Sequence, residues 1–477
     1  MINVMTRPSN AAGLGAWVRL YLFERFKGRN RRITTAAFSA LAGKVVMMFV
    51  SAITVPITVR YLGVDSYGIW ITISSTITMF LVLDIGISST LTNLISEAYA
   101  KDDRVLAAEY FSTAFWFLVG IATIIGAAGA ALWHLVSWGK VFHSQNVSLA
   151  QNTSHAMAAA FAVFLLSLPT GLVAKVLAGY QEMHVANIFS AGGSVLSLIV
   201  VLIVISIHGS LPLLVAGYAG SSVAANVICL LWICFVTKPW MKPLPGKVNL
   251  HLFQRIFGSG AQFFVIQIAG LIVFSSDNLV ISHFLSPAAV TPYSVAWRLV
   301  NYIAIGQTFL FPALWPAYSE AYAKGQIEWI RQTYRRVRKL TILLLAVGCT
   351  VMVLAGRDMI RTWAGPAAVP SESLVCLMCV WIVIYAFTTN QSCLMGATSR
   401  TGKQALIGIT AAAANLILSI VWVKSMGPFG VLLATVVSYL VFVIAVQYYE
   451  VSRILRGDFL PQDIPETSHG TGEDLTL

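Results

Sequence analysis

Charged side chains are scarce in this chain of 477 residues. Asp, Glu, Lys and Arg make up 10% of it, whereas ordinary soluble proteins carry about 25%. Hydrophobic residues make up 57%, and the mean hydropathy is +0.78. A chain of this composition cannot hide its apolar surface from water by folding on itself. The composition therefore excludes an ordinary soluble protein and indicates that the bilayer is the solvent.

Signatures of catalysis and nucleotide binding are also missing. The sequence holds no His-Glu-x-x-His motif, no Gly-rich phosphate loop with its lysine, and no long polar segment that could form a soluble domain. The six cysteines all lie inside apolar runs, where cysteine behaves as a small hydrophobe. We therefore expect a protein that is not an enzyme, needs no cofactor or metal, and does not use ATP directly.

Apolar stretches of spanning length recur along the chain and predict about twelve transmembrane helices. They lie at 34–59, 68–92, 107–132, 157–178, 185–206, 211–236, 261–284, 291–316, 340–356, 373–394, 405–423 and 428–449.

The positive charge of the chain is distributed unevenly between these stretches. In a soluble protein the net charge of +12 would suggest nucleic acid, but here the basic residues lie mostly between apolar runs. With a cytoplasmic N-terminus, 24 Lys and Arg residues fall on the cytoplasmic side and 5 on the other. This asymmetry predicts that both termini are cytoplasmic, and it leaves no reason to expect a nucleic-acid partner.

One six-residue sequence, Ser-Glu-Ala-Tyr-Ala-Lys, occurs twice, at 96–101 and at 319–324. The spacing of 223 positions is close to half the chain. With six spans in each half, the two halves enter the membrane the same way up. The predicted fold is therefore an all-α membrane protein whose helices form two parallel six-helix lobes.

The lobes come with basic and acidic extensions. Residues 1–33 form a basic cytoplasmic leader, which is either an interfacial helix on anionic lipid or a disordered segment. The last residues are acidic and polar, which is typical of a disordered cytoplasmic tail. The predicted domains are the leader 1–33, the first lobe 34–236, a linker 237–260, the second lobe 261–449 and the tail 450–477.

Four charged residues fall inside predicted spans, where ionisable groups usually mark a functional site. Arg298 is the best candidate for binding an anionic cargo, because a guanidinium matches phosphate geometry. The alternative is an ion pair with Asp277 at similar depth. Lys44 and Asp277 are further cavity candidates, and the alternative for Lys44 is that it snorkels or bonds within its lobe. Asp84 is expected to be structural, by capping backbone groups or pairing with a lysine.

The repeated motif supplies one acid and one base four residues apart in each half. Glu97 with Lys101, and Glu320 with Lys324, are i, i+4 pairs at predicted helix ends. Because the pair recurs in both halves, we expect it to be architectural, with closure of a gate as the alternative.

Two further motifs carry a family resemblance. The run from Val55 to Trp70, VPITVRYLGVDSYGIW, resembles the first outer loop of polysaccharide-biosynthesis membrane proteins, and the run from Asp84 to Ile87 is similar to a motif of the same proteins. These proteins are the O-antigen and exopolysaccharide flippases of the multidrug/oligosaccharidyl-lipid/polysaccharide exporter superfamily. The resemblance covers about residues 34–450.

That resemblance implies more than composition can. It implies a V-shaped pair of lobes around a central cavity in the bacterial inner membrane, working by alternating access. It implies a cargo, an oligosaccharide linked through pyrophosphate to undecaprenol. Membrane lipids, a polysaccharide polymerase and a chain-length regulator are the further partners that it suggests.

Two other classes of membrane protein stay open as alternatives. A glycan polymerase would be expected to carry a large outer loop with arginines and histidines, whereas the longest outer connection, about 133–156, holds one lysine and three histidines. A cation-coupled drug exporter of the same superfamily usually shows an acid in the first span of a lobe. Here the first span has Lys44, although the seventh has Asp277.

Overall fold

The computed structural model describes residues 29–80, 87–142, 147–249, 252, 275–308, 311–398 and 401–458. Helices make up nearly all of these residues, and no strand occurs among them. Within the same residues, eight helices are long and apolar enough to cross a membrane. The chain is a multi-pass all-α membrane protein, which confirms the fold class. The leader up to residue 28, residues 253–274 of the linker and the predicted seventh span, Asp84, and the tail from 459 lie outside the described residues.

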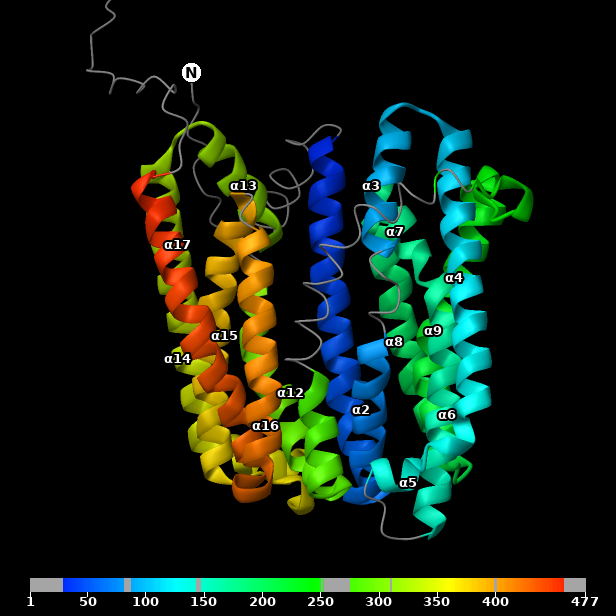
Figure 1. The fold of residues 1–477 in the computed structure, drawn as a ribbon, viewed down its shortest axis with the longest axis vertical. Coiled ribbons are helices and arrows are strands. Elements are labelled where there is room, and N and C mark those ends of the chain that lie inside the picture. The colour runs from blue at the N-terminus through cyan, green and yellow to red at the C-terminus, as the bar shows by residue number, and fades with distance from the viewer. Residues whose placement is uncertain are drawn as a thin grey trace, which may run out of the picture.

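The helices form two groups that stand side by side (Figure 1). The first group contains the long helices α2 (Arg29–Phe80), α3 (Ile87–Ala100), α4 (Arg104–Leu132), α6 (Val147–Thr170), α8 (Met183–Ser206) and α9 (Leu211–Trp232), with the shorter α5 (Trp138–Val141) and α7 (Leu172–Gly179). The second contains a helix over 275–284, α12 (Pro287–Thr308), α13 (Phe311–Ala323), α14 (Ile327–Ala364), α15 (Glu372–Ala397), α16 (Thr401–Ser438) and α17 (Ala445–Arg456).

Two of the helices are each a pair of spans joined at a glycine. The apolar part of α2 runs over 43 residues, which at about 1.5 Å per residue is twice the thickness of a bilayer. The chain reverses inside α2 at Gly63, where φ is 72°, and inside α16 at Gly427, where φ is 63°. Both values lie in the left-handed region that glycine adopts without strain. Counting each of these helices twice, and adding α12 and the predicted seventh span, accounts for twelve spans.

The sequence repeat is also a repeat of backbone structure. After the first copy of the motif, Asp103 N–H donates to Ala98 O at 3.0 Å, and after the second, Gln326 N–H donates to Ala321 O at 2.9 Å. The residue directly before each donor, Asp102 in the first copy and Gly325 in the second, has a positive φ. This combination is the signature of a Schellman turn. The next helices, α4 and α14, begin 223 positions apart, the same spacing as the motifs.

Two predicted spans differ from the helices of the structure. The predicted ninth span, 340–356, lies within α14, which begins at Ile327 and ends at Ala364. Apolar character marks only the part of a helix that lies in hydrocarbon, whereas α14 continues through basic residues that form helix equally well. The predicted eighth span, 291–316, is divided between α12 and α13.

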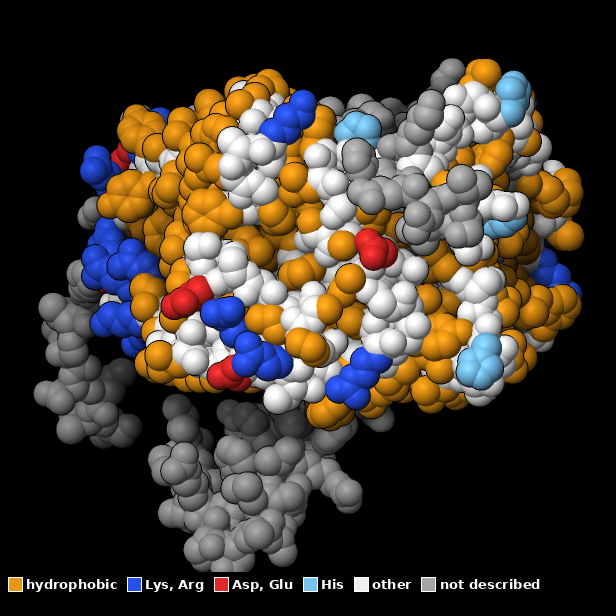
Figure 2. All heavy atoms as spheres, turned by 90° about the horizontal axis from the view of Figure 1, so that it is seen from below, with side chains coloured by type: hydrophobic (Ala, Val, Ile, Leu, Met, Phe, Trp, Pro, Cys, Tyr) orange, Lys and Arg blue, Asp and Glu red, His pale blue; other side chains and the backbone are white. Residues whose placement is uncertain are grey.

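We name the two ends of the molecule by their landmarks. The motif end holds both copies of the Ser-Glu-Ala-Tyr-Ala-Lys motif, at the top of Figure 1, and the turn end holds Gly63 and Gly427. At the turn end the two lobes meet, where α12 packs against α2. Figure 2 views the turn end, where single charged side chains lie among apolar and uncharged ones, and Lys and Arg gather at the left edge of the view.

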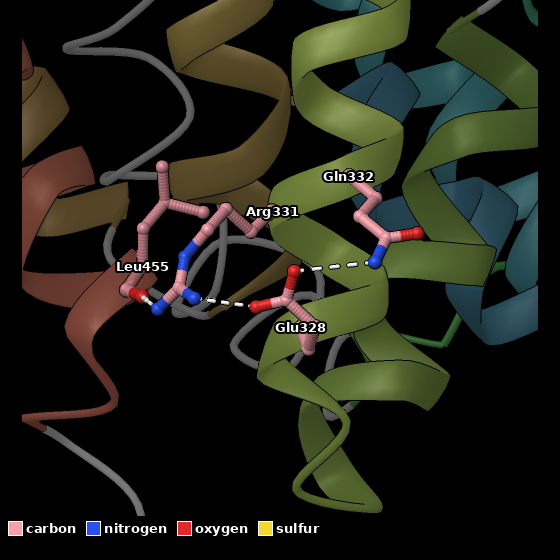
Figure 3. A network of polar contacts seen from close by, with 4 residues as sticks. All are labelled: Glu328, Arg331, Gln332 and Leu455. Atoms are coloured by element: carbon pink, nitrogen blue, oxygen red, sulfur yellow. Dashed lines mark hydrogen bonds and ion pairs between the residues drawn. The ribbon is translucent and has the colours of Figure 1, made fainter.

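The C-terminal helix α17 is tied to the start of α14 at the motif end (Figure 3). Arg331 donates to the carbonyl oxygen of Leu455 at 2.8 Å and also pairs with Glu328. Glu328 in turn accepts from Gln332 at 3.2 Å. The guanidinium therefore satisfies one of the free carbonyls at the end of α17, where a cation also complements the helix dipole.

We expect Arg331→Ala to loosen α17 without unfolding the lobe. The arginine side chain is 35% exposed, so the loss should amount to about 0.5–1 kcal/mol and remain local. Hydrogen exchange should quicken in residues 445–456 and stay unchanged in α15. The matched control is Gln332→Ala, which removes a contact to Glu328 but none to α17. Equal exchange in the two variants would contradict the capping role.

Candidate functional site

The two lobes come into close backbone contact at Gly68, in the second half of α2. A Cβ atom at this position would lie 1.8 Å from the carbonyl oxygen of Pro287, the first residue of α12. Only a residue without a side chain allows the two backbones to come this close. Gly68 belongs to the run from Val55 to Trp70 that carries the family resemblance. The close contact explains why this position of the motif is a glycine.

Hydrogen bonds between the lobes surround this contact. We call these pairs the turn-end seam, and each joins a residue of α2 to the second lobe. They are Thr291 Oγ1 to Val64 O at 2.6 Å, Asn278 Nδ2 to Ser75 Oγ at 2.8 Å, Trp363 Nε1 to Ala52 O at 2.7 Å, Arg60 Nη2 to Thr362 O at 3.3 Å and Arg298 Nη1 to Ser51 Oγ at 3.0 Å. The turn end is therefore closed in this structure, and any opening there must break the seam.

A cavity of about 430 Å³ lies between the lobes beside the seam. We call it the central cavity. Its lining comes from α2, the helix over 275–284, α12 and α15. The residues are Ile71, Ser74, Ser75, Thr78, Ser275, Asn278, Ser294, Trp297, Arg298, Asn301, Tyr302, Ala304 and Tyr385. Hydroxyls, amides and aromatic rings thus surround one cation, which is a lining that suits a polar head group with negative charge.

Arg298 is the cation of this lining. Its guanidinium donates to the hydroxyl of Ser51 across the seam, and no carboxylate of the described residues pairs with it. A guanidinium carries five N–H donors, and here one neutral hydroxyl accepts from it. Most of its hydrogen-bonding capacity is therefore left for an anionic group.

Asp277 is not the ion-pair partner of Arg298 in this structure. Its side chain is 5% exposed, and its Oδ2 accepts a hydrogen bond of 2.6 Å from the hydroxyl of Tyr293. Nor does Asp277 line the central cavity, where it was placed as a candidate; its neighbour Asn278 does. Successive residues of a helix point about 100° apart, so adjacent residues face different surroundings.

A stack of aromatic rings supports the second-lobe wall of the cavity. Trp297 lies between Tyr293 and Trp381, with ring centroids 6.0 and 6.2 Å away and interplanar angles of 13° and 17°. Trp381 also contacts Tyr385 at 5.9 Å. Trp297 and Tyr385 reach the cavity, whereas Trp381 is buried behind them. The cavity therefore has a rigid apolar platform beside its cation.

The other predicted residues lie elsewhere. Lys44 is exposed on α2 and is not part of the cavity lining. Glu97 pairs with Lys101 at 2.8 Å, as an i, i+4 contact on the helix surface. Lys324 is exposed at the end of the second motif copy, and the side chain of Glu320 lies outside the described residues.

Most residues that line the central cavity are uncharged, so charged residues in the sequence do not reveal them. The uncharged polar residues Ser74, Ser75 and Thr78 form a dense polar patch within an otherwise apolar span, a signal that the sequence did contain. The amides Asn278 and Asn301 lie beside Asp277 and Arg298 in the same way. In lipid, such groups are retained where they face other helices or a wet cavity.

Comparison with known proteins places the chain in a family. Residues 33–322, more than half of the chain, match the family described as polysaccharide biosynthesis protein. The chain therefore belongs to this family of membrane proteins. It is 26% identical to a proposed O-antigen transporter of Salmonella typhi over 62% of the chain and 67% of that relative, and 23% identical to one of Salmonella typhimurium over 80% and 92%. A proposed flippase of Haloferax volcanii is 22% identical over 85% and 81%.

Solved structures show the same fold at lower identity. An inward-facing multidrug resistance transporter of the MATE family aligns with a TM-score of 0.68 over 86% of this chain and 99% of its own, at 14% identity. The outward-facing form of such a transporter aligns with a TM-score of 0.61 over 90% and 96%, also at 14% identity. The chain therefore shares its fold with these transporters.

Proposed function

We propose that the protein is a flippase for surface polysaccharide synthesis. It moves an oligosaccharide linked through pyrophosphate to a polyprenol across the bacterial cytoplasmic membrane, for O-antigen, capsule or exopolysaccharide. The observation that carries the proposal is Arg298, a guanidinium in the central cavity with no described carboxylate to neutralise it. The names of the relatives and the exporter fold support the same conclusion.

The cavity offers a separate feature for each part of such a head group. Arg298 would hold the pyrophosphate, because a guanidinium forms charge-assisted, bidentate bonds to phosphate oxygens. The faces of Trp297 and Tyr385 would contact the sugar next to it, and Asn278 and Asn301 supply hydrogen bonds. Carrying this head group through about 30 Å of hydrocarbon without such a cavity would be prohibitively costly.

Transport would proceed by alternating access between the two ends. The turn-end seam closes the turn end in this structure, so the cargo would enter from the motif end. Breaking the seam would then open the cavity to the other side. The excess of basic residues in the connections at the motif end supports a cytoplasmic motif end and an external turn end.

Reporter fusions test this orientation. A fusion after residue 245, at the motif end, should behave as cytoplasmic, and one near residue 145, in the connection between α5 and α6, as external. The charge asymmetry supplies the reason. Alkaline phosphatase and a fluorescent protein give opposite readouts at the two sites. A cytoplasmic signal near 145 would reverse the proposed direction of transport.

A flipping assay tests the function itself. The purified protein is placed in liposomes with undecaprenyl pyrophosphate that carries one labelled N-acetylhexosamine. We expect protein-dependent movement of the label to the opposite leaflet, detected by an impermeant sugar-modifying enzyme. Head-group-labelled phosphatidylethanolamine in the same liposomes is the control and should not move faster than without protein. Equal movement of the two lipids, or of neither, would contradict the proposal.

A further inference from the structure

A smaller cavity lies at the motif end of the first lobe and shares no lining residue with the central cavity. We call it the motif-end pocket, and its volume is about 220 Å³. It lies between the turn after α3, the turn after α7 and the chain that follows α9 (Figure 1). Five of its lining residues are charged, namely Asp102, Asp103, Arg104, Glu182 and Lys238. Such a lining suits a charged ligand.

The motif-end pocket lies where the hydrocarbon of the membrane ends. Arg104 begins one of the helices that can cross a membrane, and Thr237 ends another. The residues beside them are apolar and exposed: Val105 is 70% exposed, and Phe235 and Val236 are 64% and 67% exposed. Charged groups next to exposed apolar surface, at the ends of two spans, form the kind of boundary at which a phospholipid places its head group.

Three of the five charges already have a partner within the protein. Lys238 Nζ lies 2.6 Å from Glu182 Oε2, and it also lies 4.9 Å from the centre of the Tyr180 ring. Asp103 accepts a hydrogen bond of 2.9 Å from the N–H of Leu106 and thereby caps α4. These contacts account for one cation and two acids of the lining.

One acid and one base remain, Asp102 and Arg104, and neither has an ion-pair partner among the described residues. The guanidinium of Arg104 lies over the Trp240 ring, with Cζ 4.6 Å from its centre, and this contact leaves its N–H donors available. Thr237 adds a hydroxyl oxygen that is buried without a hydrogen-bond partner in the described part of the chain. The pocket therefore offers one cationic and one anionic group to a ligand.

The second copy of the repeat shows that the turn itself does not need these two charges. At the spacing of 223 positions, Asp102 corresponds to Gly325 and Arg104 to Ile327. Both copies nevertheless form the same Schellman turn, in which Asp102 has a φ of 52° and Gly325 a φ of 69°. A left-handed conformation costs an aspartate more than a glycine. An aspartate at this position therefore favours a role for its carboxylate.

We propose that the motif-end pocket binds the head group of phosphatidylethanolamine. Arg104 and the Thr237 hydroxyl donate to the phosphate, and Asp102 accepts from the primary ammonium group. The acyl chains lie against the exposed apolar residues beside the pocket. A zwitterion fits because one charge of each sign remains in the lining. Phosphatidylglycerol would leave Asp102 without a cation, and phosphatidylcholine has no N–H to donate to it.

A lipid in this pocket joins three connections of the first lobe. Asp102 belongs to the turn between α3 and α4, Glu182 precedes α8, and Thr237 ends the span that contains α9. The bound head group would thus hold the motif end of this lobe together as one unit. Because the central cavity is not involved, this proposal does not depend on the proposed cargo.

Lipid binding to the purified full chain tests the proposal. Native mass spectrometry of the protein in detergent gives the affinity for phosphatidylethanolamine, phosphatidylcholine and phosphatidylglycerol with the same acyl chains. We expect the first phosphatidylethanolamine molecule to bind about fivefold more tightly than either of the others. This factor corresponds to about 1 kcal/mol, at about 1.4 kcal/mol per factor of ten, for one charged contact at a partly exposed site. Equal affinity for the three lipids would overturn the proposal.

Substitutions separate the two ends of the head group. Asp102→Gly copies the second repeat and so keeps the turn; it should abolish the preference for phosphatidylethanolamine without weakening the binding of phosphatidylglycerol. Arg104→Gln keeps the side-chain stem against Trp240 but should weaken both lipids, because both carry a phosphate. The matched control is Lys101→Gln, which removes a neighbouring charge outside the pocket lining and should bind like the parent. A preference for phosphatidylethanolamine that survives Asp102→Gly would refute the site.

Glycerophosphoethanolamine distinguishes a lipid from a soluble ligand. It has the same head group without acyl chains, so an equal concentration should not displace the lipid. Displacement would overturn the lipid proposal and show that the pocket takes a soluble ligand. A thermal melt of each variant confirms that the affinities come from folded protein. Failure of the flipping assay would leave these results unchanged, and failure of lipid binding would leave the cargo proposal intact.

Discussion

Arg298→Ala is expected to lower the flipping rate by about thirtyfold or more, while folded protein accumulates at nearly the parental level. Losing a desolvated, charge-assisted contact to an anion costs about 2–5 kcal/mol, which at about 1.4 kcal/mol per factor of ten gives this size of effect. Stability should survive because the partner of Arg298 in the structure is the neutral Ser51 hydroxyl. Its loss strands no buried carboxylate. In cells, lipid-linked repeat units should accumulate on the cytoplasmic leaflet.

Companion variants separate cargo binding from a structural role. Arg298→Lys should recover part of the rate, because the charge remains while the bidentate geometry is lost. Ser51→Ala removes only the protein partner of the guanidinium and should transport nearly as well as the parent. If Arg298 served Asp277 in another state of the cycle, Arg298→Ala with Asp277→Asn would restore transport. Full transport in that double variant would contradict cargo binding.

The all-α membrane fold could be predicted from the sequence because bilayer thickness acts on long segments. Apolar stretches marked the spans, and the repeat at 96–101 and 319–324 showed that the two halves are built alike. The structure adds that both copies end in the same Schellman turn. The true ends of α14 could not be found in this way, because its basic turns form helix outside the hydrocarbon.

The candidate site was only partly accessible to the same reasoning. Charge inside a span pointed to Arg298, which does line the central cavity. Hydropathy does not show which face of a helix a residue occupies. It therefore could not predict that Asn278 lines the central cavity while Asp277 does not. The hydrogen bond from Tyr293 to Asp277 depends on how two helices of the second lobe pack, which a single sequence does not reveal.

Gly68→Ala is expected to prevent the turn end from closing. The added methyl carbon would lie 1.8 Å from the carbonyl oxygen and 2.6 Å from the carbonyl carbon of Pro287, so two backbones must move apart. Trimming the side chain of Pro287 cannot relieve this clash, because both atoms belong to the main chain. Nitroxide labels on cysteines that replace Ser137 and Ser425, two exposed residues on different lobes at the turn end, should lie farther apart than in the parent protein. Flipping should fall by at least about tenfold, since one step of the cycle is lost.

The same substitution at a glycine with free space shows that the effect comes from the seam. Gly120 lies in α4, and a Cβ atom there would have no neighbour within 4 Å. Gly120→Ala should leave the label distance and the flipping rate unchanged, and its helix should gain up to about 1 kcal/mol of intrinsic stability. Gly68→Ala brings the same intrinsic gain to α2, so a loss of function there cannot be ascribed to a weakened helix. A normal label distance and a normal flipping rate in Gly68→Ala would show that this backbone contact is not formed when the transporter closes its turn end.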